Sequence, residues 1–265
     1  MVRVVTAIVL GLIVFGIVWF LPGWGLGALV LVASALGLWE FGGMFLSGGA
    51  ERWTVLIAGL AVAAKMVIFP QDPVEALLLI VFALFVLTFV FARAADELAG
   101  SATRLAAGMM GIVYLGIAFP FWSWIGALPA GKALVLLAIV PACLCDTFAL
   151  IAGKTFGRHK MAPRMSPNKT VEGLIGALAG SLAGIFLMRW ILIPTLPIHH
   201  ALVLAVLIWV SSPFGDLVES YFKRSSGVKD SGTIIPGHGG VLDRLDALVF
   251  TGPAVYAYFK YAMGM

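Results

Sequence analysis

The sequence has little charge and almost no cysteine. Aspartate, glutamate, lysine and arginine make up 11% of its 265 residues, against about 25% in an ordinary soluble domain. A soluble domain of this length needs more charge to cover its surface, so this scarcity excludes that class. Strict alternation of apolar and polar residues is missing, which excludes a transmembrane β-barrel. The sequence also contains no convincing internal repeat, which leaves an inverted-repeat transporter without support.

Hydrophobic residues dominate instead, at 62% of the chain, and the mean hydropathy is +1.06. They occur in runs close to the roughly 20 residues that an α-helix needs to cross a bilayer. Helices are expected because lipid offers no partner to an unpaired backbone amide. We therefore predict an all-α, polytopic transmembrane bundle of about nine spans. The predicted spans are 4–20, 25–47, 53–69, 74–92, 105–126, 132–153, 171–193, 201–222 and 247–263.

The basic residues predict how these spans are oriented. With nine spans, the N-terminus and the segments 48–52, 93–104, 154–170 and 223–246 fall on one side, and most lysines and arginines lie there. Such residues mark the cytoplasmic side. We expect the N-terminus and both long polar loops in the cytoplasm and the C-terminus outside. The net charge of +4 then reflects this bias and local features of two loops, not binding to nucleic acid.

Acidic side chains of the C-terminal half gather at the predicted cytoplasmic ends of spans. A charge at membrane depth costs roughly 2.5–3.5 kcal/mol to insert, so each acid needs a partner or an aqueous cavity. Asp216 and Glu219 are three residues apart, as are Asp243 and Asp246, so each pair shares one helix face. Converging carboxylates beside basic loops suit Mg²⁺, which binds few carboxylates and completes its shell with water and phosphate oxygens. Ion pairing with neighbouring arginines is the alternative.

The two long loops, 154–170 and 223–246, carry most of the basic residues of this half. They act either as ordinary topogenic charge beside anionic headgroups or as a clamp for a polyphosphate. Glycines in the run 236–240 allow consecutive amides to approach an anion. Ser166-Pro167 and Thr170-Val171-Glu172 both resemble helix starts, where free amides favour phosphate. In the glycine run, His238 is either a phosphate donor or a simple turn residue.

Four glycines recur at helix-packing spacing in the seventh predicted span. They are Gly173, Gly176, Gly180 and Gly184. Small residues at this spacing let two helices approach closely. The contact lies either within the bundle or across a dimer, and the spacing does not distinguish the two.

The polar stretch near the C-terminus resembles a known signature. It reads Ser220-Tyr221-Phe222-Lys223-Arg224, Lys229-Asp230-Ser231-Gly232, Ile235-Pro236-Gly237-His238-Gly239-Gly240 and Asp243-Arg244-Leu245-Asp246. These runs are similar to the signature of the phosphatidate cytidylyltransferase (CDP-diacylglycerol synthase) family and match it at every fixed position. Asp146, Gly153-Lys154, Phe156-Gly157-Arg158, Ser166-Pro167, Lys169-Thr170, Glu172-Gly173 and Gly215-Asp216 with Glu219 also look like that family. The resemblance is sharp over roughly 146–246, and a spaced pattern this long is far more specific than a lone glycine motif.

This resemblance implies transfer of the cytidylyl group from CTP to phosphatidate, which gives CDP-diacylglycerol and pyrophosphate. It further implies a homodimer in a bacterial plasma (inner) membrane, with its site at the cytoplasmic leaflet, Mg²⁺ as cofactor and K⁺ as a second cation. By this likeness, Asp216, Asp243 and Asp246 are expected to bind the metal. Lys169, Lys229, Asp230 and Arg244 are expected to act in catalysis. Contacts to the phosphates of the two substrates are expected from Asp146, Lys154, Arg158, Ser166, Ser220, Lys223, Arg224, His238, Gly239 and Gly240.

We expect residues 1–130 to form a lipid-facing scaffold of about five spans and residues 131–265 to carry the catalytic loops. Three other functions fit parts of the pattern. A CTP-dependent polyprenol or lipid-alcohol kinase would release CDP instead of pyrophosphate. A related synthase acting on an ether lipid shares the same chemistry. An anionic-solute transporter would place its polar residues near mid-membrane in broken helices, whereas here they cluster at one face.

Overall fold

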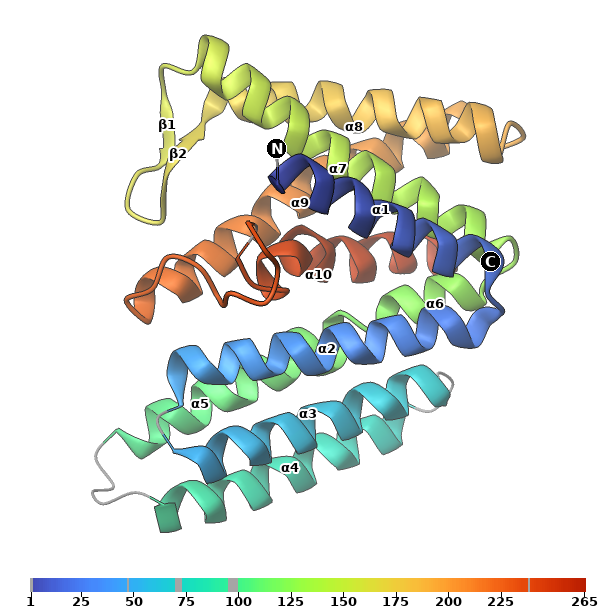
Figure 1. Ribbon diagram of the computed structural model, residues 1–265. Helices are drawn as coiled ribbons and strands as arrows, with labels where there is room; N and C mark the ends of the chain where they lie inside the picture. The colour runs from blue at the N-terminus through green and yellow to red at the C-terminus, as the bar shows by residue number, and fades with distance from the viewer. Residues whose placement is uncertain (1, 47, 70–72, 95–99, 238) are drawn as a thin grey trace. The chain divides into compact units, whose positions relative to one another are not determined.

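The computed structural model describes residues 2–46, 48–69, 73–94, 100–237 and 239–265, and these are mainly helical (Figure 1). The first half contains α1 (Val2–Phe20), α2 (Gly23–Phe45), α3 (Gly49–Ile68), α4 (Pro73–Ala94), α5 (Ser101–Gly111), the π-helical η1 (Ile112–Ala118) and α6 (Phe121–Ala127). The second half contains α7 (Gly131–Phe156), β1 (Lys160–Ala162), β2 (Ser166–Thr170), α8 (Val171–Leu192), α9 (Ile198–Ser225), α10 (Leu242–Ala257) and the π-helical η2 (Tyr258–Ala262).

Each predicted span falls on helix. Within the described residues, five helical stretches are long and apolar enough to cross a membrane: Gly23–Phe45, Ser101–Ala127, Gly131–Phe156, Val171–Leu192 and Ile198–Ser225. Val5–Phe20 and Leu77–Arg93 are apolar but shorter. These helices point to an integral membrane protein. Nine complete crossings and their orientation stay a prediction.

The described helices form two compact units. The first comprises Met1–Ile17, Leu21–Trp124 and Asp230–Asp243, and the second comprises Val18–Phe20, Ile125–Lys229 and Arg244–Met265. In the first, α2, α3, α4 and α5 pack together with η1. A segment from the polar C-terminal stretch, 230–243, therefore belongs with the N-terminal helices. The scaffold role expected for residues 1–130 stays a prediction.

The second unit contains a feature that the all-α prediction missed. β1 and β2 form an antiparallel hairpin that extends past the ends of α7 and α8 (Figure 1), with Lys160 opposite Thr170 and Ala162 opposite Ser166. The expected helix start at Ser166-Pro167 is wrong, because both residues lie in β2. Proline is tolerated there because a two-stranded hairpin leaves one edge of each strand unpaired. The expected start at Thr170 is confirmed: its Oγ1 caps α8 by accepting from the Gly173 amide at 3.0 Å.

The glycine stripe of α8 packs against α7 of the same chain. A Cβ placed on Gly176 would lie 2.8 Å from the Phe148 carbonyl oxygen, and one on Gly184 would lie 2.5 Å from the Pro141 Cα. The two helix backbones are therefore in direct contact along this stripe. Of the two contacts that the glycine spacing left open, within the bundle or across a dimer, the structure shows packing within the chain.

We expect Gly180→Ala to destabilise the protein by about 1–3 kcal/mol, the usual cost of overpacking. A Cβ there would lie 2.8 Å from the Leu144 carbonyl carbon and 2.8 Å from the Phe148 Cβ, so a helix must shift. Thermal unfolding of the purified protein in detergent measures the effect. Gly11→Ala is the matched control, since nothing lies within 4 Å of its added Cβ. Equal midpoints for the two variants would contradict close packing of α7 and α8.

Candidate functional site

Three carboxylates converge in the second unit. Asp216 and Glu219 lie on α9 and Asp246 lies on α10, and one oxygen from each lies within 4.8 Å of the others. The two helices meet closely at Gly215, where an added Cβ would collide with the Asp246 carbonyl oxygen. The absence of a side chain at Gly215 thus permits the convergence. The sequence predicts Glu219 as the i,i+3 partner of Asp216 and not as a metal ligand, and the structure adds Glu219 to this group of acids.

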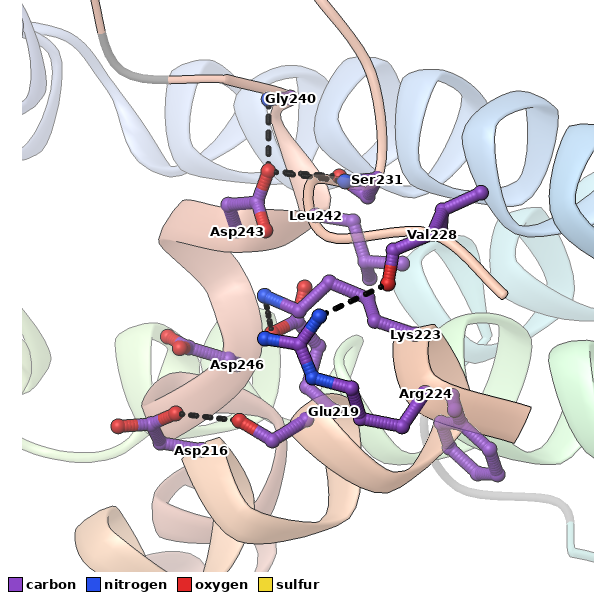
Figure 2. Close-up of polar contacts among 12 residues, drawn as sticks. Asp216, Glu219, Lys223, Arg224, Val228, Ser231, Gly240, Leu242, Asp243 and Asp246 are labelled. Atoms are coloured by element: carbon purple, nitrogen blue, oxygen red, sulfur yellow. Dashed lines mark hydrogen bonds and ion pairs between the residues drawn. The ribbon is translucent and has the colours of Figure 1, made fainter. Parts of the chain in front are cut away.

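Cations and a hydroxyl surround this acid cluster (Asp216, Glu219 and Asp246). Glu219 is fully buried and forms an ion pair with Lys223 one helical turn later (Figure 2). The Ser220 hydroxyl donates to Asp216 Oδ1 at 3.3 Å. Carboxylates this close repel one another unless positive charge is near. The Lys223 ammonium group therefore reduces the free-energy cost of holding three acids together.

Lys169 reaches the cluster from the hairpin. Its Nζ lies 2.8 Å from Asp216 Oδ2 and donates to the Pro213 carbonyl oxygen at 3.1 Å, and its side chain is 18% exposed. β2 thus delivers a largely buried ammonium group to α9. Lys169, a predicted catalytic residue, thus contacts the acid cluster at Asp216.

Asp146 lies on α7 and contacts α9. The Ser212 hydroxyl donates to Asp146 Oδ1 at 3.1 Å, and Ser212 lies one turn before Asp216 on α9. The second unit therefore brings together predicted residues from α7, β2, α9 and α10.

Asp243 lies in the first unit and is bound by its own loop. Its Oδ2 accepts hydrogen bonds from the Ser231 amide at 3.1 Å, the Ser231 hydroxyl at 3.1 Å and the Gly240 amide at 2.8 Å (Figure 2). Gly239 has φ +83°, and a Cβ there would lie 2.6 Å from Asp243 Oδ2. Of the described residues in the glycine run, Gly240 donates its amide to an anion, and that anion is the Asp243 carboxylate of the chain itself. An approach of consecutive amides of the run to an anion stays a prediction. A substrate role for Gly239 and Gly240 stays a prediction.

Glu40 of α2 is a second carboxylate in this loop, and sequence reasoning missed it. It is 4% exposed. It accepts from the Ser231 hydroxyl at 3.0 Å, the Val241 amide at 2.9 Å and the Leu242 amide at 2.8 Å. One signal was available, because an ionisable residue inside an apolar span is a functional candidate by default.

The remaining predicted residues lie mostly on the surface. Lys154, Arg158, Arg224, Lys229, Asp230 and Arg244 are exposed. The Arg224 guanidinium donates to the Val228 carbonyl oxygen at 3.2 Å, which stabilises the turn after α9. Ser166 is partly exposed in β2, and His238 lies outside the described residues. Exposed cations in polar segments are compatible with phosphate binding and with topogenic charge alike.

The acid cluster fits a divalent cation by its chemistry. Mg²⁺ binds carboxylate oxygens and keeps several sites for water and phosphate. Oxygens from three carboxylates within 4.8 Å supply such a donor set. Among the predicted ligands, Asp216 and Asp246 belong to the cluster, and Asp243 belongs to the first unit, where it accepts hydrogen bonds from its own loop. Its role as a metal ligand stays a prediction.

Comparison with known proteins relates this chain to cytidylyltransferases. Over 145 residues it is 42% identical to a phosphatidate cytidylyltransferase of Staphylococcus haemolyticus and 41% identical to one of Staphylococcus aureus, covering 55% of this chain and 55% of each relative. It is 40% identical over 140 residues to a phosphatidate cytidylyltransferase of Thermotoga maritima, covering 51% of this chain and 52% of that protein. The matched stretch thus spans about half the length of these relatives.

The family match is broader than these pairwise alignments. The sequence model of the cytidylyltransferase family matches residues 1–262. The family match therefore includes the N-terminal helices, which lie outside the stretch 146–246 where the signature residues are found. With nearly the whole chain matched, the protein belongs to the cytidylyltransferase family.

Proposed function

We propose that this protein transfers the cytidylyl group of CTP to phosphatidate. A phosphate oxygen of phosphatidate attacks the α-phosphorus of CTP and forms a new P–O bond. The bond from that phosphorus to the oxygen bridging to the β-phosphate breaks, and pyrophosphate leaves. The products are CDP-diacylglycerol and pyrophosphate. The nucleophile is the substrate's own phosphate, so the protein needs no nucleophilic side chain.

One observation carries this proposal: the acid cluster beside Lys169 in a member of this family. Transfer between two anionic substrates requires positive charge at the reacting phosphates and alignment of the attacking oxygen with the α-phosphorus. Bound by the cluster, Mg²⁺ would neutralise phosphate oxygens and orient the leaving group. A purely structural bundle would not need three converging acids and a partly exposed lysine at one position.

The residues have separate tasks in this proposal. Asp216 and Asp246 would hold the cation together with Glu219, and Asp243 stays a predicted ligand. Lys169 stabilises negative charge on the reacting phosphates. Lys223 holds Glu219 in place through its ion pair. Exposed Lys229 and Arg244 attract the anionic substrates from solution.

The site is proposed to face the cytoplasm, where CTP is available and where the basic residues are expected. Phosphatidate reaches it from the inner leaflet of a bacterial plasma membrane. A homodimer and K⁺ as a second cation remain proposals that rest on the family resemblance.

A direct assay tests the reaction. Purified protein is incubated with CTP labelled in the cytosine ring, phosphatidate and Mg²⁺, and we expect label in the lipid fraction together with one pyrophosphate per lipid formed. A lipid alcohol replaces phosphatidate in a parallel reaction. Label recovered as CDP, with a newly phosphorylated lipid, would identify a kinase instead. Uptake of CTP into vesicles without any product would identify a transporter.

A further inference from the structure

Glu40, a buried acid of α2, accepts hydrogen bonds from segment 230–242, which is the part of the signature that belongs to the first unit. Glu40 lies in α2 between Trp39 and Phe41, and the residues that donate to it are 191 to 202 positions later. All the residues involved belong to the first unit. The contact therefore links the half of the sequence with the least distinctive motifs to the half with the signature.

The described residues of segment 230–241, all but residue 238, have little regular structure of their own. Ile235 pairs with Gly239 in a single bridge, and Gly237 and Gly239 have positive φ angles of 76° and 83°. A segment with few backbone hydrogen bonds of its own opens easily unless other groups hold it. Glu40 and Asp243 supply that support, because their carboxylates accept hydrogen bonds from its amides and from the Ser231 hydroxyl.

Glu40 also caps a helix from a distance. α10 begins at Leu242, and the first amides of a helix have no partner within it. Two of these amides, of Val241 and Leu242, donate to the Glu40 carboxylate. A negative charge at this end is favoured by the helix dipole. Glu40 thus sets where α10 starts and how its first turn, with Asp243, is directed.

The fit around Glu40 leaves no room for adjustment. A Cβ on Gly232 would lie 2.6 Å from Glu40 Oε1, and a Cβ on Gly240 would collide with Glu40 Oε2 and with the Ser231 hydroxyl. Burying a carboxylate is costly unless it is fully hydrogen-bonded. An apolar residue here would leave the Ser231 hydroxyl and the Val241 and Leu242 amides without this acceptor. The Glu40 carboxylate therefore has a role beyond filling the core.

We propose that Glu40 is a positioning residue for catalysis: it holds segment 230–242 in the shape that the reaction requires, and with it Asp243 and the adjacent Asp230. This inference rests on the proposed cytidylyl transfer. Glu40 touches no substrate in this scheme and acts through the residues that it orients.

Glu40→Gln tests the proposal, because it keeps the shape of the side chain and removes its charge and one acceptor. We expect kcat to fall at least tenfold with little change in KM for CTP. Hydrogen exchange of the amides in 231–242 should become faster. Glu40→Asp, which restores the charge on a shorter stem, should recover part of the rate.

Glu51→Gln is the matched control. Glu51 is also buried in this unit, but it pairs with Arg104 at 3.1 Å and not with the segment.

Gly232→Ala provides a second test that leaves Glu40 intact. Its methyl group must displace either the carboxylate or the segment, so kcat should fall as in Glu40→Gln. In a Glu40→Ala background the colliding atoms are gone, and the same substitution should then add little further loss. Additive losses in the double variant would show that the two residues act independently and would overturn the proposal.

Three outcomes separate this inference from the proposed function. Unchanged exchange of 231–242 and a normal kcat in Glu40→Gln would overturn the role of Glu40 alone. Equal losses of kcat in Glu40→Gln and Glu51→Gln, in step with their unfolding midpoints, would reduce Glu40 to a stabilising residue and likewise overturn it. Absence of cytidylyl transfer by the unmodified chain would overturn the proposed function, and with it the catalytic part of this inference.

Discussion

Asp246→Asn is expected to lower kcat by on the order of 10³-fold, the upper range for losing one preorganised electrostatic group such as an oxyanion-hole donor. Asparagine keeps the size of the side chain and an oxygen that can accept the hydrogen bond from the Ala247 amide, which is 2.7 Å long in the native protein. The variant should therefore fold normally. It lacks one of the three charges that converge within 4.8 Å, and Mg²⁺ should bind it more weakly.

A readout besides activity distinguishes weaker metal binding from other damage. A ligand that binds only the folded state stabilises it by about 2.7 kcal/mol at 100 times its Kd, so Mg²⁺ should raise the unfolding midpoint of the unmodified protein. It should raise that of Asp246→Asn much less. Glu51→Gln, which removes one negative charge outside the cluster where Glu51 pairs with Arg104, should keep both the activity and the response to Mg²⁺. Full activity of Asp246→Asn at low Mg²⁺ would show that the metal assignment is wrong.

Lys169→Met should lower kcat by about 10²–10³-fold, because it removes a cation that stabilises the reacting phosphates. Methionine preserves most of the apolar stem, so the packing of β2 against α9 should survive. In the native protein, Lys169 Nζ lies 2.8 Å from Asp216 Oδ2. Two roles are compatible with this contact: stabilisation of substrate charge, and simple neutralisation of the acids.

The response to Mg²⁺ separates these two roles. Lys169 and the cation share Asp216, so the variant should bind Mg²⁺ at least as tightly as the native protein while turning over far more slowly. A near-normal kcat with tighter Mg²⁺ binding would leave Lys169 only the neutralising role. Lys160→Met is the control, since Lys160 is an exposed lysine of the same hairpin. It should leave kcat and Mg²⁺ binding unchanged.

The helices were predictable because their signal is local. Each apolar run exceeds what a soluble surface tolerates, and its length matches a bilayer. The hairpin was not predictable in this way. The segment 160–170 is polar and short. Whether its residues pair as strands depends on how α7 ends and α8 begins. Thr170 was readable as a cap because capping acts over three residues, whereas the strand pairing of Ser166 with Ala162 requires the folded loop.

The acids of the site show the same division. Asp216 with Glu219 is an i,i+3 pair on one helix, and the signature named Asp246 without any structure. Their convergence needed the contact of α9 with α10 at Gly215, which no local pattern encodes. Glu40 is the clearest case, because its donors lie about two hundred positions away.

By itself, the sequence determined that the chain is an apolar helical membrane protein of the cytidylyltransferase type, because hydrophobicity, capping and the spaced signature act over short stretches. The tertiary structure alone decided that the α8 glycines pack on α7, that Lys169 reaches Asp216, and that Glu40 and Asp243 hold segment 230–242. These are contacts between residues far apart in the sequence, and they exist only once the folded backbone has brought those residues together.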